Sequence, residues 1–343
     1  MYYHIKWKFK KSWHLFFLLL FLSACTFQQN TKPVKLIGET QGTYYSVIYY
    51  DDQQRDFQFE IDSLLKDFDQ SLSLWVPNSI ISMVNRNDTM AMLDHFFIEN
   101  FEIAKEVANK TNGAFDPTVG SLVRAWGFGF DATKHVDDKI IDSILQFTGY
   151  QKVRVKNRKL IKDDIRTTID FNAIAQGYSV DLLGSFLEEK GIKNYLADIG
   201  GEVKAKGNKP DEIKWKVGIE KPAENKNDQR DLKAIVTLKD KSIATSGNYR
   251  KFYEEDGIRY AHTINPKTGY PVQHSLLSVS VMAESTAIAD AYATAFMVMG
   301  LENAITYISK DTSLEAFFIY ADEQGNYQTY ASEGFKTHIS AEY

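Results

Sequence analysis

The chain contains a single cysteine, Cys25, which directly follows an apolar run near the N-terminus. With one cysteine no intramolecular disulfide can form, and a cysteine-rich zinc site is excluded. The body must therefore be held together by its hydrophobic core and its hydrogen bonds. The 343 residues, 44% of them hydrophobic, are enough to bury the core of one large domain or of two.

The first 24 residues are typical of a bacterial lipoprotein signal peptide. A lysine-rich start precedes the apolar run from Leu15 to Leu22, which is far shorter than the roughly 20 residues of a membrane-spanning helix. The segment Leu22-Ser23-Ala24-Cys25 resembles a lipobox, in which the thiol is alkylated by a lipid donor. We expect residues 1–24 to be the signal peptide, Cys25 to be lipidated and residues 25–35 to form a tether. The alternative is an ordinary signal peptide, or a short anchor, with a chance cysteine.

On the lipobox interpretation, the mature body is lipid-anchored to a bacterial membrane on its extracytoplasmic, periplasmic side. The net charge of the chain also limits the classes of partner that it can bind. Forty basic and 45 acidic residues give a net charge of -5, so the chain lacks the broad positive surface of a nucleic-acid-binding protein. We therefore expect a membrane contact through the lipid and no nucleic-acid partner.

The body shows strand and helix patterns without regular alternation, which favours an α+β fold over a doubly wound sheet. Apolar spacing predicts helices over 61–72 and 97–108, a third after Asn172 and a fourth over 285–299. Strands are predicted at 36–50, 195–205, 215–219, 234–238 and 276–282. No Pro/Gly/Ser linker divides the chain, so residues 36–340 are predicted to form one domain.

Three turn-rich segments contain candidate ligand-binding residues. In the segment 113–120 (GAFDPTVG), Asp116 can accept a hydrogen bond from a base or a ribose, although a structural turn is the alternative. The segment 170–178 (DFNAIAQGY) places Asp170 at a strand-to-helix junction. Free N–H groups there bind anions, unless Asn172 only caps the helix. The segment 198–202 (DIGGE) is either a hairpin bend or a backbone cradle for a ligand.

Two later segments add proton-transfer and metal-ligand chemistry. His262 opens the segment 262–269 (HTINPKTG) and can move a proton near neutral pH, but a lone histidine is more often structural. Asp290 and Thr294 are four residues apart and share one helix face, where they can offer hard oxygens to Mg²⁺. The alternative is an acid near a helix N-terminus and a threonine bonded back to its own helix.

In their order, these segments resemble the FAD:protein FMN transferase family, the ApbE family of flavin transferases. The resemblance runs from about Gly42 to Gly300 and is carried by Gly42-Thr43, LSLW at 72–75, GAFDPTVG, DFNAIAQGYSVD, DIGGE, IATSGNY, HTINPKTG and ADAYATA. It implies an ApbE-type, T-fold-like architecture of mixed sheets with packed helices. Residues 36–340 would then be the flavin transferase domain.

The resemblance implies Mg²⁺-dependent transfer of FMN from FAD, the substrate, to a threonine or serine hydroxyl of an acceptor redox protein, with release of AMP. His262 matches the histidine implicated in catalysis. The expected metal ligands are the backbone oxygen of Ala173 and the side chains of Asp290 and Thr294. The positions that match FAD contacts are Gln41, Trp75, Ala114, Phe115, Asp116, Asp170, Gln176 and Ile264.

Three positions depart from the family pattern. Gln41 stands where methionine is frequent, Trp75 where tyrosine is commoner, and Asn265 where aspartate is frequent. Two other functions use the same residues. An FAD pyrophosphatase would let water replace the acceptor hydroxyl, and a flavin-binding lipoprotein would store or deliver FAD without chemistry.

Overall fold

The structure is a computed structural model that describes residues 1–4, 32–128, 136–222, 231–248, 252–255 and 258–343. Cys25 and the rest of the predicted lipobox lie outside these residues. Within the described ranges, no helix has the length and apolar character needed to cross a bilayer.

The core of the fold is an antiparallel sheet of eight strands in the order β1-β2-β5-β6-β9-β12-β13-β14. Its strands are β1 (Pro33–Thr40), β2 (Thr43–Tyr50), β5 (Tyr195–Ile199), β6 (Glu202–Lys206), β9 (Lys241–Gly247), β12 (Leu276–Ala283), β13 (Glu315–Ala321) and β14 (Tyr327–Ala331). A three-stranded sheet has the order β15-β8-β7, and β3-β4 and β10-β11 form two hairpins. These strands are β3 (Val153–Lys156), β4 (Lys159–Lys162), β7 (Trp215–Glu220), β8 (Leu232–Leu238), β10 (Phe252–Glu255), β11 (Ile258–Ala261) and β15 (Ile339–Glu342).

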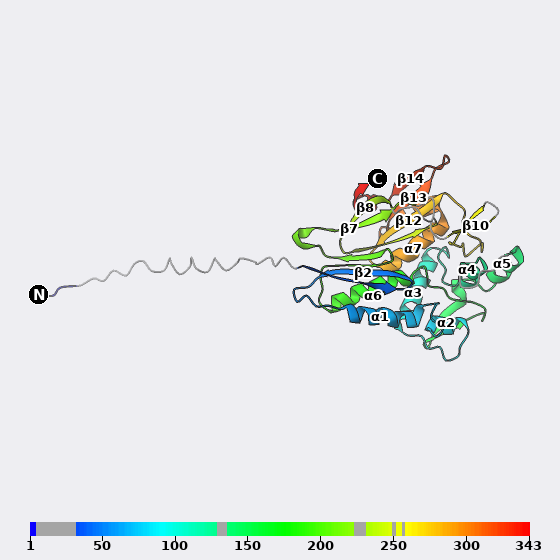
Figure 1. Ribbon diagram of the computed structural model, residues 1–343, viewed down its shortest axis with the longest axis horizontal. Coiled ribbons are helices and arrows are strands. Elements are labelled where there is room, and N and C mark those ends of the chain that lie inside the picture. The colour runs from blue at the N-terminus through cyan, green and yellow to red at the C-terminus, as the bar shows by residue number, and fades with distance from the viewer. Residues whose placement is uncertain (5–31, 129–135, 223–230, 249–251, 256–257) are drawn as a thin grey trace.

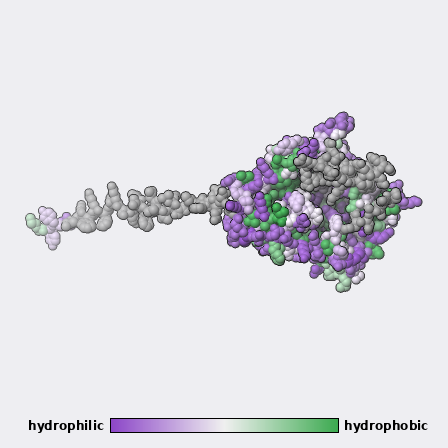
Figure 2. Space-filling model, viewed as in Figure 1, coloured by the Kyte–Doolittle hydropathy of each residue, from purple (hydrophilic) through white to green (hydrophobic). Residues whose placement is uncertain are grey.

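Helices cover one face of the large sheet, and the three-stranded sheet covers the other (Figure 1). The helices are α1 (Gln58–Leu72), α2 (Ile80–Asn85), α3 (His95–Lys110), α4 (Gly120–Ala125), α5 (Asp138–Leu145), α6 (Ala175–Glu189), α7 (Thr286–Met299), α8 (Leu301–Ile308) and α9 (Glu333–Lys336). Two short 3₁₀ helices span Tyr150–Lys152 and Pro210–Glu212. Apolar stripes of α1 and α6 pack under β1, β2 and β5, while α7 contacts β9 and β12. On the face drawn in Figure 2, hydrophilic residues predominate, with smaller apolar patches between them.

The predicted α+β class is confirmed, but two predicted strands are hairpins. The segment 36–50 is divided between β1 and β2 by a turn in which Gln41 and Gly42 have φ angles of 51° and 73°. This is the left-handed turn that matches the twist of paired strands. Gly200 and Gly201, at φ angles of 62° and 114°, divide 195–205 into β5 and β6 in the same way. These two turns later prove to lie at the candidate site.

The four predicted helices are confirmed as α1, α3, α6 and α7. Side-chain and glycine caps explain their ends. Asp94 begins α3 by accepting from Phe97 N, and Gly113 N closes its end on Ala108 O at 2.8 Å. Ser285 caps α7 at its start, and Gly300, with φ of 76°, ends it.

Candidate functional site

Asp290 and Thr294 lie one turn apart on α7, where this helix meets α6 and β9. The amide of Gly177, in the first turn of α6, donates to Asp290 Oδ2 at 3.2 Å. The hydroxyl of Thr294 lies 3.1 Å from that of Ser246 on β9. The fold thus places both predicted side-chain metal ligands at the junction of three elements.

The third predicted metal ligand, the carbonyl oxygen of Ala173, belongs to the segment that leads into this junction. The helix α6 has Ile174 as its N-cap, so Ala173 lies just outside it. In a helix extended by one turn, the Gly177 amide would donate to Ala173 O. In this structure the Gly177 amide donates to Asp290 instead. Within the described residues, Ala173 O therefore accepts no backbone hydrogen bond.

Gln176 connects α6 to the hairpin of β5 and β6. Its Nε2 donates to Ile199 O at 2.8 Å and also to the carboxylate of Glu202. A Cβ on Gly200 would lie 2.3 Å from Gln176 Nε2 and 2.9 Å from a methyl carbon of Thr43, so only glycine fits in this turn. The segments DFNAIAQG, DIGGE and Gly42-Thr43 therefore meet at one place.

Gln41, next to Gly42 in the same turn, is one of the three positions where the chain departs from the family pattern. Its side-chain Nε2 is buried and has no hydrogen-bond acceptor within the described residues. A buried amide without a partner costs stability of about 1–3 kcal/mol unless a ligand or water satisfies it. The observation suits a residue that faces a bound molecule.

Burial disfavours the ionised form of three carboxyl groups in this region. Burial raises the pKa of Asp198 and raises that of Asp290 to about 7. Burial also raises the pKa of Glu202 well above its ordinary value, and the charge of Asp290 raises it further. Within the described residues, none of the three has a Lys, Arg or His nitrogen within 4.0 Å. If these groups ionise, their buried negative charge has no basic partner within the described residues, so a bound cation would favour the ionised forms.

A cation here would need neutral oxygens as well as carboxylate. In the part of the chain that the structure describes, no three His, Cys, Asp or Glu side chains are arranged to hold a metal ion. Asp290 would accordingly act together with the hydroxyl of Thr294 and a backbone carbonyl. This is a set of hard oxygens that suits Mg²⁺, with waters or substrate oxygens at the remaining positions.

The segment 113–120 lies beside the segment that leads to Asp170, because Asp170 N donates to Pro117 O at 2.8 Å. That segment forms only an isolated bridge between Thr168 and Val119, so the strand predicted before Asp170 is wrong. The carboxylate of Asp116 is already bonded within the fold. It accepts from Thr118 N and Thr118 Oγ1 at 2.8 and 2.6 Å and from Tyr150 N at 2.9 Å. The structural-turn alternative therefore accounts for every described bond of Asp116. Its FAD contact stays a prediction, as do those of its buried neighbours Ala114 and Phe115.

Asp170 is half-buried, and its Oδ1 accepts from Asn172 N at 2.8 Å. Burial raises the pKa of this carboxyl group, since that effect outweighs the bond from Asn172 and the charge of Arg124. The Asn172 side chain does not cap α6, whose N-cap is Ile174. The cap expected as the alternative is therefore wrong, because α6 begins later than Asn172.

His262 is half-buried, and its ring lies 6.4 Å from that of Phe128. The adjacent Thr263 donates from Oγ1 to Asn248 Oδ1 at 2.9 Å, so HTINPKTG is fastened to the segment that contains Ser246. Ile264 is buried against Leu122 and other apolar residues of α4 and α5. The segment 246–248 thus contacts both the histidine segment, at Thr263, and α7, at Thr294.

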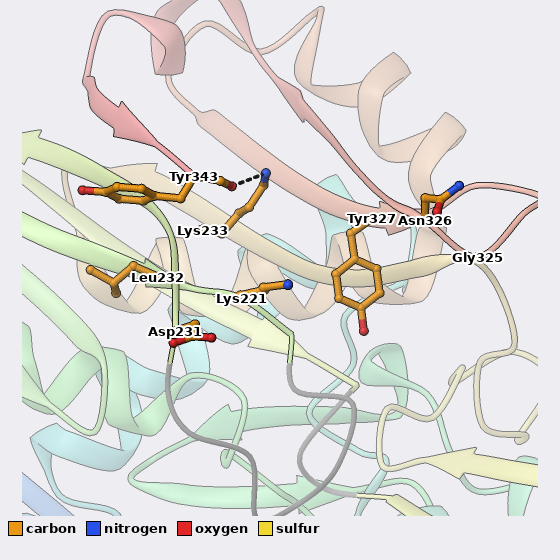
Figure 3. A pocket seen from close by; sticks show the side chains of 8 residues that line it. All are labelled: Lys221, Asp231, Leu232, Lys233, Gly325, Asn326, Tyr327 and Tyr343. Carbon is orange, nitrogen blue, oxygen red and sulfur yellow. Dashed lines mark hydrogen bonds between the residues drawn. The ribbon is translucent and has the colours of Figure 1, made fainter.

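Trp75, in the loop between α1 and α2, is 63% exposed. Two surface pockets lie elsewhere and contain none of the predicted site residues. One, of about 740 Å³, lies between β7, β8, β14 and the C-terminus (Figure 3). The other, of about 440 Å³, lies between β1 and α1.

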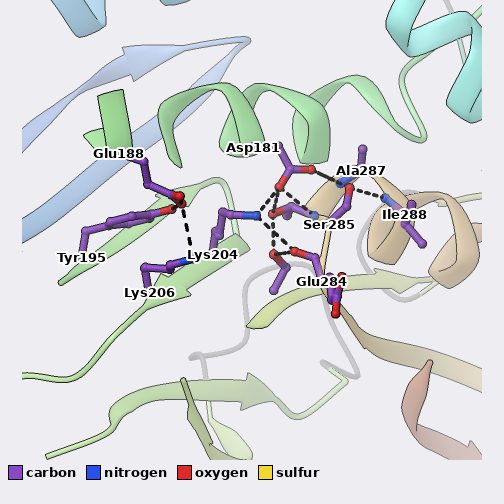
Figure 4. Close-up of polar contacts among 11 residues, drawn as sticks. Asp181, Glu188, Tyr195, Lys204, Lys206, Glu284, Ser285, Ala287 and Ile288 are labelled. Carbon is purple, nitrogen blue, oxygen red and sulfur yellow. Dashed lines mark hydrogen bonds and ion pairs between the residues drawn. The ribbon is translucent and has the colours of Figure 1, made fainter. Parts of the chain in front are cut away.

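Asp181 positions α7, the helix that contains Asp290 and Thr294, a role that sequence reasoning missed. Its Oδ1 accepts from Lys204 Nζ at 2.8 Å and from Thr286 N at 3.0 Å. Its Oδ2 accepts from Ser285 Oγ at 2.7 Å and from Ala287 N at 3.0 Å (Figure 4). An anion at a helix N-terminus is favourable, and here it fixes α7 to α6 and β6.

Sequence reasoning also missed Gly177, Ser246 and Glu202, although each lies in a quoted segment. Gly177 offers the clearest signal, since a glycine inside a helical pattern often marks close packing. The roles of Ser246 and Glu202 depend on cross-strand and interhelical contacts that no local pattern encodes.

We predict that Gly177→Ala lowers the free energy of unfolding by about 1–3 kcal/mol. An added Cβ would lie 2.5 Å from Thr286 O and 2.8 Å from Asp290 Cβ, so α6 and α7 must move apart. Urea unfolding would measure the loss, with Glu189→Ala at an exposed position of α6 as the control. An unchanged midpoint for Gly177→Ala would contradict the close packing.

The chain is similar in sequence and fold to known flavin transferases. Residues 41–318 match the ApbE family. The FAD:protein FMN transferase of Vibrio cholerae is 34% identical over 333 residues, which cover 94% of this chain and 97% of that protein. The solved structure of the flavin transferase ApbE from Vibrio cholerae aligns with a TM-score of 0.79 at 32% identity, over 90% of this chain and 99% of its own. The solved structure of the Pseudomonas stutzeri flavinyl transferase ApbE, apo form, aligns with a TM-score of 0.80 at 30% identity, over 91% of this chain and 98% of its own. The chain therefore belongs to the ApbE family.

Proposed function

We propose that the protein transfers FMN from FAD to a threonine or serine hydroxyl of an acceptor redox protein, with Mg²⁺ bound and AMP released. Its relatives bear the name FAD:protein FMN transferase. The observation that carries the proposal is the contact of the buried Asp290 carboxylate with the first turn of α6, without a basic partner in the described residues.

Asp290, Thr294 and Ala173 are the residues that would hold Mg²⁺. When bound, the ion would neutralise negative charge on the diphosphate of FAD as AMP departs. The N-terminus of α6, a helix of 15 residues, lies at the same junction. Its amide dipoles carry partial positive charge and favour a phosphate group there.

His262 would accept the proton of the incoming hydroxyl. The acceptor oxygen would then bond to the phosphorus of the FMN half. The bond from that phosphorus to the bridging oxygen would break, and the bridging oxygen would leave as part of AMP. A positioned general base contributes about 10²–10⁴ to the rate of such a step. Gln41, Trp75, Gln176 and the other predicted FAD contacts would hold the flavin nucleotide in place.

Incubating the protein with FAD and Mg²⁺, with and without a co-expressed candidate redox subunit, tests the proposal. A mass gain of one FMN on a hydroxyl residue of that subunit supports it. Rapid FMN release without any acceptor indicates a pyrophosphatase instead. FAD that stays bound and unchanged at every Mg²⁺ concentration indicates a storage protein.

We predict that His262→Ala keeps FAD affinity but loses about 10²–10⁴ of the turnover, because nucleophile activation acts on the rate more than on binding. Flavin fluorescence quenching measures affinity, and mass spectrometry of the acceptor measures turnover. His274→Ala is the matched control, since His274 is exposed and contacts Met297 O outside the site. A collapse of FAD affinity in His262→Ala would make His262 a pocket residue instead.

We also propose that Cys25 is lipidated and that the mature body is extracytoplasmic, anchored to a bacterial membrane. The lipobox-like segment supports this proposal. Replacing Cys25 with serine would then move the protein from the membrane fraction to the soluble fraction and abolish incorporation of labelled palmitate. Membrane retention in that variant would instead fit an uncleaved signal anchor.

A further inference from the structure

The side-chain amide of Gln176, in the first turn of α6, is held by two acceptors of the hairpin formed by β5 and β6. Its Nε2 donates to Ile199 O at 2.8 Å and to the carboxylate of Glu202. The atom that faces Ile199 O must be the nitrogen, because a carbonyl oxygen only accepts hydrogen bonds and two oxygens at that distance would repel each other. Both N–H groups of the amide are therefore used within the fold.

The other polar atom of this amide, Gln176 Oε1, has no such partner. No group of the described residues donates a hydrogen bond to it, and the residue is half-buried, so part of it stays accessible. An amide oxygen has two lone pairs and accepts hydrogen bonds from N–H and O–H groups. The fold thus leaves one acceptor of Gln176 available to a molecule that binds at this junction.

The amide of Gln176 cannot turn over without a loss of hydrogen bonds. In the reversed orientation Oε1 would face the carbonyl oxygen of Ile199, and Nε2 would lose both of its acceptors. Gly200 adds a steric limit, because a Cβ on this residue would lie only 2.3 Å from Gln176 Nε2. The hairpin therefore fixes one orientation of the amide, with the nitrogen toward the turn.

Glu202 supplies the only one of these constraints that comes from a side chain. It pairs with Ile199 across the hairpin, so the carboxylate and the carbonyl that hold Gln176 come from two facing residues. Glu202 is buried, so water competes little for its bond with Gln176. A substitution at this position can therefore change the orientation of Gln176 and leave the backbone of the turn in place.

The neighbouring hairpin of β1 and β2 adds a group of the opposite kind. The Nε2 of Gln41 is buried and lacks an acceptor within the described residues. Thr43, two residues further along the chain, packs on the same turn, since a Cβ on Gly200 would lie 2.9 Å from its methyl carbon. The junction thus offers an unused donor and an unused acceptor. FAD carries carbonyl, N–H and O–H groups that suit both.

We propose that Glu202 is a positioning residue: together with Ile199 O it orients the amide of Gln176 so that Oε1 accepts a hydrogen bond from an N–H or O–H group of FAD. This rests on the proposed function, because FAD is the substrate of that reaction. The donor belongs either to the FMN half, on the isoalloxazine ring or the ribityl chain, or to the AMP half, on the adenine or the ribose. Glu202 acts on FAD through Gln176.

Two neutral replacements isolate the acceptor at position 202. Glu202→Gln removes the charge and keeps an oxygen that accepts from Gln176, whereas Glu202→Leu removes both. Flavin fluorescence quenching measures FAD affinity in EDTA, so that neither metal nor chemistry intervenes. We expect Glu202→Leu to bind FAD about tenfold more weakly than Glu202→Gln, a loss equivalent to about one hydrogen bond. Equal FAD affinities of the two variants would overturn the proposal.

The same comparison in a Gln176→Leu background tests whether Glu202 acts through Gln176. There the difference between the two replacements at position 202 should vanish, because no amide remains to be oriented. A difference in FAD affinity that persists in this background contradicts the positioning role. Glu202→Met, which fills the same space with a flexible side chain, takes the place of Glu202→Leu if circular dichroism shows that the leucine variant is unfolded.

FMN and AMP, used as separate probes, then locate the donor. Weaker binding of FMN to Glu202→Leu than to Glu202→Gln places the donor in the FMN half of FAD. The same result with AMP places it in the AMP half. If each probe binds the two variants equally, the proposed hydrogen bond is absent.

Transfer assays with FAD, Mg²⁺ and a candidate redox subunit separate this proposal from the proposed function. The Michaelis constant for FAD should be about tenfold higher in Glu202→Leu than in Glu202→Gln, with turnover numbers within about twofold of each other. A lack of transfer in every variant, with the difference in FAD binding intact, would count against the reaction and leave the positioning role in place. A lower turnover number with an unchanged Michaelis constant would sustain the reaction and overturn the positioning role.

Discussion

Asp290→Asn should lose transfer activity by a factor on the order of a thousand while the protein stays folded. A bound divalent ion supplies several kcal/mol of transition-state stabilisation, at about 1.4 kcal/mol per factor of ten. Asparagine keeps the size of the side chain and an oxygen that can accept from Gly177 N, but it lacks the charge that holds the ion. Mass spectrometry of the acceptor measures the rate.

The folded state of Asp290→Asn should not suffer. The buried carboxyl group, 7% exposed, has a raised pKa, so its ionised form is disfavoured in the metal-free protein. In EDTA at a pH above 7, the free energy of unfolding of the variant should equal or exceed that of wild type. Mg²⁺ should then raise the melting temperature of wild type and leave that of the variant unchanged. Undiminished transfer, or an unaltered Mg²⁺ effect on melting, would remove the proposed metal site.

Unlike Asp290→Asn, Asp181→Ala should destabilise the fold, with a loss of about 3–5 kcal/mol in the free energy of unfolding. The change leaves the first amides of α7 without their acceptor and leaves the ammonium of Lys204 with the carbonyl of Glu284 but no carboxylate. The side chains of Asp181 and Lys204 are only 17% and 19% exposed, so water can replace the lost bonds only in part.

Chemical denaturation measures this loss, with Glu323→Ala at an exposed turn as the control. Asp181→Asn should fall between wild type and alanine, because one amide oxygen can still accept. Metal-induced stabilisation should persist in Asp181→Asn, since this residue anchors α7 and is not a proposed ligand. A stability equal to wild type in Asp181→Ala would show that α7 is held by its apolar contacts alone.

The sequence predicted long elements well and short ones poorly. The helices α1, α3, α6 and α7 have apolar stripes that repeat over several turns, and such patterns need no knowledge of partners. The hairpin of β3 and β4 and the strand β15 have four residues per strand, too few to establish a period. No element was predicted after Gly300, where the structure has β13, β14 and β15 in addition to α8 and α9.

The sequence likewise predicted some features of the candidate site and not others. The segments were found because glycines, acids and one histidine gather in turns, and because their order resembles one family. Asp116 shows the limit, since its carboxylate is bonded to Thr118 and Tyr150, a partner 34 residues away. A pattern within one segment cannot tell such a carboxylate from one that faces a ligand.

The sequence by itself determined the residue types available for chemistry and the caps that begin and end α7. These are local properties, fixed by backbone sterics and hydrogen bonds within a few residues. Only the tertiary structure decided that Gly177 contacts Asp290, that Ser246 faces Thr294 and that Asp181 anchors α7. Those contacts join residues between 48 and 113 positions apart, and they form because each apolar helix face must be buried against the sheet.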